Sequence, residues 1–97
     1  MNVVDYCLQN VGNEKNTVYA VVRGWQFTVL VMEVDRASKG WEGFGFVINH
    51  DFPECSELGY LDLRQYDMTG MEVVEDFTPC SLSDAKLLYM SKSEDVL

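Results

Sequence analysis

The 97-residue sequence is poor in the residue types on which most chemistry depends. It has one histidine and three cysteines without CxxC spacing, and its seven lysines and arginines are outnumbered by sixteen aspartates and glutamates. An odd number of scattered cysteines argues against a disulfide framework and favours a reducing compartment. No apolar run reaches the roughly eighteen residues of a membrane span, and the first ten residues lack the basic start of a signal peptide. We therefore expect a cytoplasmic protein.

Motifs that mark catalytic, nucleotide or metal sites are also missing. The sequence contains no P-loop, GxGxxG, GxSxG or HExxH pattern. A Cys-His pair of His50 with Cys55 or Cys80 is conceivable, but neither cysteine has a family signature around it. The nominal metal ligands near the histidine have the spacing of neither a zinc site nor an EF-hand loop: Asp51, Glu54, Cys55 and Glu57. We predict a protein that is not an enzyme and has no cofactor and no metal.

The longest strand-favouring stretch runs from Thr17 to Arg36 and is rich in β-branched and aromatic residues. Gly24 marks a tight turn or a bulge between two strands. Side-chain alternation after this turn gives two faces, with Trp25, Phe27, Val29 and Val31 on one and Leu30, Met32 and Val34 on the other. This pattern predicts a central strand whose second face is covered for part of its length.

Residues 41–49, WEGFGFVIN, continue the strand pattern, and part of this segment resembles a nucleic-acid motif. Gly43 to Val47 resembles the RNP1 box of the RNA-recognition-motif family, whose alternate aromatics stack on bases. Glu42 stands where that box has Lys or Arg, Asn49 stands where it has an aromatic residue, and the preceding segment is a strand where the family has a helix. We interpret the segment as a core strand with a glycine strip, across which Trp25 or Trp41 lies.

Two further strands and an N-terminal helix complete the expected elements before residue 80. Apolar side chains at helical spacing predict a helix over residues 2–11, which Gly12 ends. Alternation over 58–66 predicts a half-exposed strand, and 71–77 is expected to return as its hairpin partner across a turn at 67–70.

The last expected element is a C-terminal helix. Ser81 is placed as its N-cap with Asp84 three residues later, and the helix is expected to run to about Lys92, with 94–97 fraying. Its apolar stripe comprises Leu82, Ala85, Leu88 and Tyr89. Short connections between successive strands favour antiparallel pairing. The sequence thus predicts a single domain over residues 1–97 of the α+β class, with a two-layer arrangement of an antiparallel meander of about five strands and a helix at each end.

Negative charge is confined to one part of the chain. Residues 41–84 contain ten acids and a single base, Arg64, whereas the segments before and after are neutral. Such asymmetry bears on partners and solubility, not on fold. We predict that a partner-binding surface forms from this segment, with the following residues: Glu42, Asp51, Glu54, Glu57, Tyr60, Asp62, Asp67, Glu72, Glu75 and Asp76.

Two functions from different classes fit this layout. In the first, the chain is a small acidic inhibitor that docks on a basic protein such as a nuclease or CRISPR effector, as anti-CRISPR proteins of phages and mobile elements or nuclease immunity proteins do, and contacts neither nucleic acid nor membrane directly. In the alternative, it is a non-catalytic adaptor or an oligomer subunit, a homodimer included, that binds through a sheet edge or an apolar patch. Only the first should weaken steeply with salt.

Overall fold

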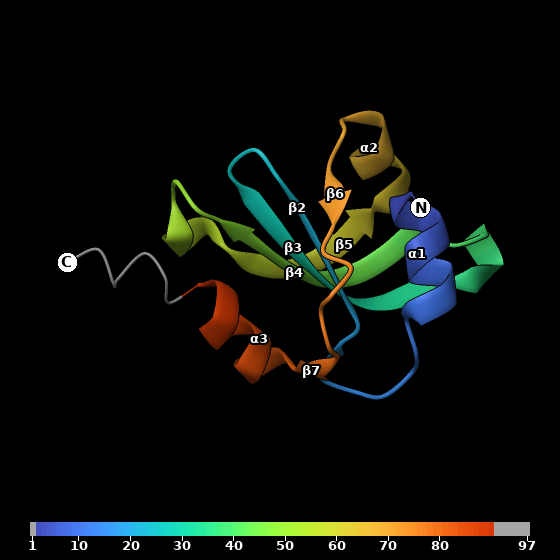
Figure 1. Cartoon of the computed structure of the whole chain (residues 1–97), viewed down its shortest axis with the longest axis horizontal. Coiled ribbons are helices and arrows are strands. Elements are labelled where there is room, and N and C mark those ends of the chain that lie inside the picture. The colour runs from blue at the N-terminus through green and yellow to red at the C-terminus, as the bar shows by residue number, and fades with distance from the viewer. Residues whose placement is uncertain (1, 91–97) are drawn as a thin grey trace.

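The computed structural model describes residues 2–90 and confirms the predicted fold class, an antiparallel five-stranded sheet with a helix near each end (Figure 1). The helices are α1 (Val3–Asn10), α2 (Leu63–Met68) and α3 (Leu82–Tyr89), and the short 3-10 helices are η1 (Arg36–Ser38) and η2 (Pro53–Cys55). The strands are β1 (Thr17–Val18), β2 (Ala20–Gly24), β3 (Phe27–Asp35), β4 (Glu42–Asn49), β5 (Glu57–Asp62), β6 (Glu72–Val73) and β7 (Cys80–Ser81).

The sheet has the order β5-β4-β3-β2-β6, and β1 pairs separately with β7. Strands β2 to β5 form the predicted meander, but the predicted hairpin of 58–66 with 71–77 is wrong. Strand β5 ends at Asp62, whose side chain accepts a hydrogen bond from Gln65 N at 3.2 Å and caps α2. The chain then crosses the sheet, and β6 pairs with β2. An aspartate at the N-cap explains why the chain turns helical although the apolar alternation continues from Leu61 to Leu63.

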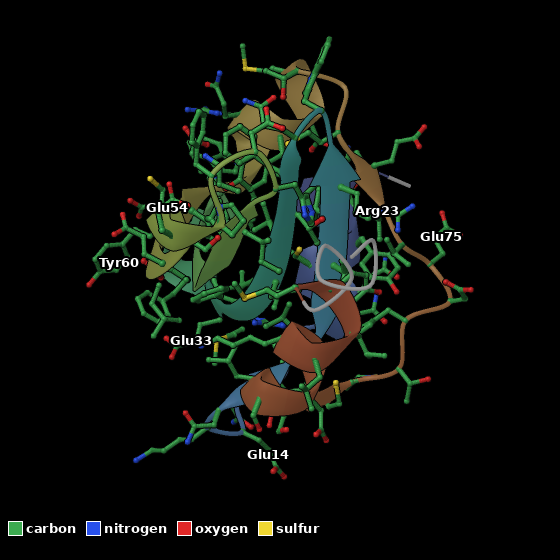
Figure 2. The ribbon with its side chains drawn as sticks, turned by 90° about the vertical axis from the view of Figure 1, so that its left-hand side faces the viewer. Glu14, Arg23, Glu33, Glu54, Tyr60 and Glu75 are labelled. Carbon is green, nitrogen blue, oxygen red and sulfur yellow. The ribbon has the colours of Figure 1, made fainter. Side chains whose placement is uncertain are left out.

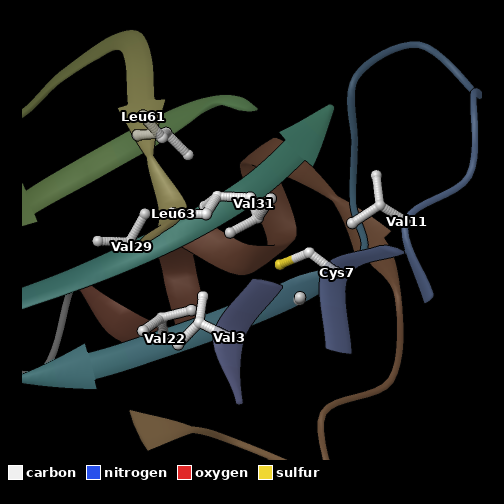
Figure 3. Close-up of a cluster of buried hydrophobic side chains, with 9 residues drawn as sticks. Val3, Cys7, Val11, Val22, Val29, Val31, Leu61 and Leu63 are labelled. Atoms are coloured by element: carbon white, nitrogen blue, oxygen red, sulfur yellow. The ribbon is translucent and has the colours of Figure 1, made fainter. Parts of the chain in front are cut away.

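Helices pack on both faces of the sheet (Figure 1). Helix α1 covers one face, where its buried residues meet those of the sheet and of α2 (Figure 3): Val3, Cys7, Val11, Ala20, Val22, Val29, Val31, Leu61 and Leu63. Helix α3 contributes Ala85 to the other face, in a cluster with Val18, Val21, Leu30, Met32, Phe46 and Ile48. The sheet therefore carries an apolar cluster on each side, although α3 covers only part of its face.

A register shift between Val31 and Glu33 interrupts the pairing of β3 with β4. Such a bulge places two residues of one strand opposite one of the other and reverses the side-chain alternation beyond it. Val34 consequently packs with Val31 on the α1 side, although strict alternation assigned it to the face of Leu30 and Met32. The same shift turns Glu33 toward the α3 side, where it lies opposite Phe44.

The glycine strip of β4 exists, but no tryptophan lies on it. A Cβ at Gly43 would lie 3.3 Å from Leu63 Cδ1, and one at Gly45 would lie 3.2 Å from Leu61 Cδ1. The two leucines from β5 and α2 thus occupy the space that the missing side chains leave. Trp25 instead protrudes from the β2–β3 turn, with φ 55° and 85% of its surface exposed.

The two terminal helices begin with side-chain caps. Asn2 accepts a hydrogen bond from Asp5 N at 2.8 Å in α1, and Ser81, the predicted N-cap of α3, accepts one from Asp84 N at 3.1 Å. Leu88 of the predicted apolar stripe is 54% exposed. Helix α3 ends at Tyr89, and the expected continuation to Lys92 and the fraying of 94–97 lie outside the described residues. Within residues 2–90, no helix has the length and apolarity to cross a bilayer.

Candidate functional site: an acidic sheet face

The structure does not bring the ten predicted partner-binding residues together on one side. Six belong to β4, β5 or the loop between them: Glu42, Asp51, Glu54, Glu57, Tyr60 and Asp62. Three belong to β6 or the segment after it, at the opposite edge of the sheet: Glu72, Glu75 and Asp76. Figure 2 shows this separation, with Glu54 and Tyr60 on one side of the molecule and Glu75 on the other, near Arg23. The expectation that all ten residues form one convergent surface is therefore wrong.

Asp67, the tenth residue, has a structural role that the sequence did not indicate. Its carboxylate accepts hydrogen bonds from Val3 N at 2.6 Å and Val4 N at 3.2 Å, at the N-terminus of α1. Backbone N–H groups at a helix start lack intrahelical acceptors, and a carboxylate there also interacts favourably with the helix dipole. Burial, and secondarily the Asp67 charge, raises the pKa of Cys7 to about 12, so that this thiol stays protonated at neutral pH.

Carboxylates do gather on one face of the sheet, in two rows that cross β3, β4 and β5. The first row is Asp35, Glu42 and Asp62, and the second is Glu33, Phe44 and Tyr60, with each neighbouring pair in direct register. Residues in direct register have side chains on the same face, with Cβ atoms about 5 Å apart. We call these six residues the acidic face. Four of its members are carboxylates, and each of those four residues is exposed.

A shallow pocket of about 170 Å³ lies on the acidic face. Its lining contains three carboxylates, two aromatic residues and no base: Glu33, Val34, Asp35, Glu42, Gly43, Phe44 and Tyr60. A second hollow of about 390 Å³ shares Glu42 and Tyr60 with the first and extends it over Trp41, Asp62 and Arg64. The guanidinium of Arg64 lies 4.4 Å from the centroid of the Trp41 ring, in cation–π contact. The two hollows form one continuous strip along β4 and β5.

Apolar groups on this strip are unusually accessible. Tyr60 is 91% exposed, although its ring contacts Phe44 edge-on with centroids 5.6 Å apart, and Leu58 is 48% exposed. On the neighbouring part of the same face, Lys86 of α3 has its Nζ 4.3 Å from the centroid of the Phe46 ring. Aromatic side chains bordered by charge are typical of interface centres.

The other candidate residues are engaged or dispersed. His50 Nε2 lies 2.7 Å from Thr28 Oγ1, and the two atoms share a hydrogen bond. Cys7 is buried, Cys55 is exposed, Cys80 is half-buried, and all three are free thiols. In the part of the chain from residue 2 to residue 90, no three His, Cys, Asp or Glu side chains are grouped so as to hold a metal ion.

Sequence reasoning found three members of the acidic face, Glu42, Tyr60 and Asp62, and missed Glu33, Asp35 and Phe44. Glu33 and Asp35 lie in the segment whose net charge is zero, so a count along the chain hides them. Only the register of β3 with β4, including the bulge, places them beside Glu42. The available signal was their i, i+2 spacing at the end of a strand, which predicts side chains on one face.

Comparison with known proteins adds no identity to this geometry. No family model matches the chain, and no curated protein or solved structure matches it.

Proposed function

We propose that this chain is a small acidic, non-catalytic binding protein of the cytoplasm that inhibits a nucleic-acid-handling protein by occupying its basic surface. The acidic face would present carboxylates at the positions where that partner otherwise holds phosphates. Nuclease immunity proteins and anti-CRISPR proteins of phages and mobile elements act in this general manner, and the analogy rests on size and charge.

The observation that carries this proposal is the row of three carboxylates, Asp35, Glu42 and Asp62, side by side on adjacent strands. Like charges directly opposite each other destabilise a sheet, so the row lowers the stability of the free protein. A cationic partner would offset that repulsion, and Tyr60 beside the row supplies the aromatic contact area on which interface affinity often depends. Acids that serve only to keep the protein in solution need no such row, because they can be spread over the whole surface.

The test begins by immobilising the chain and passing over it a nuclease-treated extract of its source cells. The retained protein is then purified, and its dissociation constant is measured by calorimetry at low and high salt. The triple variant Glu33→Gln, Glu42→Gln, Asp62→Asn should weaken binding by at least about tenfold, because each close charge pair at an interface is worth on the order of 1 kcal/mol or more. Asn at position 62 keeps an N-cap for α2.

The matched control is Glu72→Gln, Glu75→Gln, Asp76→Asn, which removes the same charge from the opposite edge and should change affinity by less than about threefold. The chain should also displace a DNA or RNA duplex from the partner. Equal losses in the two triple variants, affinity that is independent of salt, or a partner without nucleic-acid affinity would each contradict the proposal.

The adaptor alternative keeps one observation in its favour, the exposed Leu58 and Tyr60 on edge strand β5. Under that alternative both triple variants bind as the wild type does, and Tyr60→Ala alone weakens the complex.

A further inference from the structure

Strand β5 is the only long free edge of the sheet within residues 2–90. It pairs with β4 over all six of its residues and has no second neighbour, whereas the other edge strand, β6, has only two residues. An edge strand presents unpaired backbone N–H and C=O groups to which another strand can bond.

The register identifies which backbone groups of β5 are free. Leu63 N donates to Trp41 O at 3.0 Å, which continues the β5–β4 register by one pair. Hydrogen-bonded and non-bonded pairs alternate in an antiparallel ladder, so Leu61, Gly59 and Glu57 bond β4. The N–H and C=O groups of Leu58 and Tyr60 therefore point away from β4, toward the open edge.

The opposite side of β4 supports this assignment. His50 N donates to Gln26 O at 2.8 Å, one pair beyond the β3–β4 register, so the even-numbered residues at this end of β4 bond β3 and its odd-numbered residues are free to bond β5. Gly45 and Gly59, which face each other, are then a bonded pair. Both sides of the strand give the same alternation.

Apart from the acids at its two ends, β5 lacks the usual devices that block an edge. The strand ELGYLD contains no lysine, no proline and no bulge. Its only charges are Glu57 and Asp62 at the two ends. If a second copy of the chain added its own β5 in antiparallel fashion, residues with free groups would have to face each other, so even-numbered residues would pair with even-numbered ones. The acidic faces of the two copies would then lie on the same side of the joined sheet, and each copy carries a net charge of −9. This repulsion disfavours a second copy as the occupant.

We propose that β5 accepts an added strand from a partner, an extended segment with lysine or arginine at alternate positions. The inference rests on the proposed function and specifies how the basic surface is held. Backbone bonds to Leu58 and Tyr60 provide affinity, and the alternate side chains of the added strand lie over the acidic face. A cation opposite Asp62 would extend the row of Asp35, Glu42 and Asp62 by one position.

A defined probe tests this without the partner, namely a seven-residue peptide of alternating lysine and valine, blocked at both ends. In a nitrogen-15 NMR titration of the full chain, we expect slower hydrogen exchange at the amides of Leu58 and Tyr60. The amides of Gly59 and Leu61 should change little, because they already bond β4. Two further peptides are methylated at every second backbone nitrogen, one on the lysines and one on the valines. One of the two should bind at least about tenfold more weakly than the other, because only one set of N–H groups faces β5.

A protein variant supplies a second readout. Leu58→Pro removes an N–H that faces the open edge, so it should fold with a small loss of stability and lose affinity for the peptide. Gly59→Pro removes an N–H that bonds β4, so it should be the more destabilised of the two by urea unfolding. The reverse order would overturn the assignment of free groups on which the inference depends.

The outcomes separate this inference from the proposed function. Equal binding of the two methylated peptides, or no binding of the unmodified peptide at about 1 mM, overturns strand addition. In either case electrostatic docking on a basic partner is tested separately, by comparing the triple variant of the acidic face with the control triple variant at the opposite edge.

Discussion

At the scale of single residues, position in the sequence says little about what a carboxylate does. Asp67 and Asp62 belong to the same acidic segment and lie five residues apart. Asp67 holds the N-terminus of α1 through Val3 N and Val4 N, more than sixty residues away in the chain. Asp62 caps α2 and also completes a row of carboxylates on the sheet. The difference arises from which backbone or side-chain groups the fold brings to each oxygen.

Replacing Asp67 by alanine should lower the free energy of unfolding by about 1–2 kcal/mol, because two N–H groups at the start of α1 lose their acceptor. Asp67→Asn should lose less, since an amide oxygen can still accept from Val3 N while the charge–dipole interaction is removed. Urea unfolding followed by tryptophan fluorescence measures both. Asp51→Ala, at an exposed loop carboxylate, is the control and should stay within about 0.5 kcal/mol of wild type. Equal stability of Asp67→Ala and Asp51→Ala would remove the capping role.

The roles that residues take alone were the easiest to predict from the sequence. Ser81 was identified as an N-cap because its hydroxyl needs only the backbone three residues later. The roles that depend on distant partners were not predictable in this way. No local pattern indicated that Asp67 contacts α1, or that Leu61 and Leu63, and not a tryptophan, fill the glycine strip of β4.

At the scale of elements, the facing pair Gly45 and Gly59 shows how differently two strands of one sheet are constrained. A Cβ added at Gly45 would collide with the carbonyl of Leu30, while one added at Gly59 meets nothing within 4 Å. Strand β4 is central and pairs with β3 on one side and β5 on the other, whereas β5 is an edge strand. The open space around Gly59 lies on the same edge strand to which we propose that a partner strand is added.

Gly45→Ala should therefore destabilise the protein by about 2–3 kcal/mol, since the β3–β4 backbone has to shift to relieve the overlap. Gly59→Ala should be neutral or stabilising by up to about 1 kcal/mol, because alanine lowers the conformational entropy of the unfolded chain where nothing obstructs its methyl group. Thermal and urea unfolding of the two variants give the comparison. A similar loss in both would show that β5 is as closely packed as β4.

Elements with one uninterrupted period were predictable, and elements where the period changes were not. The N-terminal helix, the first strands and the residues of β4 follow from their 3.6- or 2-residue repeats. The start of α2 was missed because Leu61 and Leu63 continue the strand alternation across the Asp62 cap. The bulge after Val31 was missed because its position depends on the pairing of β3 with β4.

At the scale of the whole molecule, the ten acids of residues 41–84 are divided between β4, β5 and the loop joining them, the opposite edge around β6, the cap Asp67 and helix α3. The acids of residues 41–84 are close in sequence but do not gather on one side of the fold, because the chain crosses the sheet between β5 and β6. The acidic face instead draws Glu33 and Asp35 from the neutral part of the chain. Charge counted along a sequence thus predicted that an acidic surface exists, but not which residues form it.

The arrangement of charge on β5 also bears on the solution state of the protein. A free, regular edge with exposed Leu58 and Tyr60 favours self-association, and the acids at both ends of the strand oppose it. The balance is set by repulsion between the acids that the two copies bring together along this edge. That repulsion weakens when the charges are neutralised or screened.

The variant Glu57→Gln, Asp62→Asn should therefore form more dimer than the wild type, which should sediment as a monomer at low salt. The control Glu75→Gln, Asp76→Asn has the same net charge but lies at the other edge, so it should remain as monomeric as the wild type. Sedimentation velocity over a range of protein concentrations, at ionic strengths of about 0.01 and 0.1 M, distinguishes local repulsion on β5 from the effect of total charge. If the control dimerises as readily, total charge keeps the chains apart. If neither variant does, the edge of β5 is protected by something other than its two terminal acids.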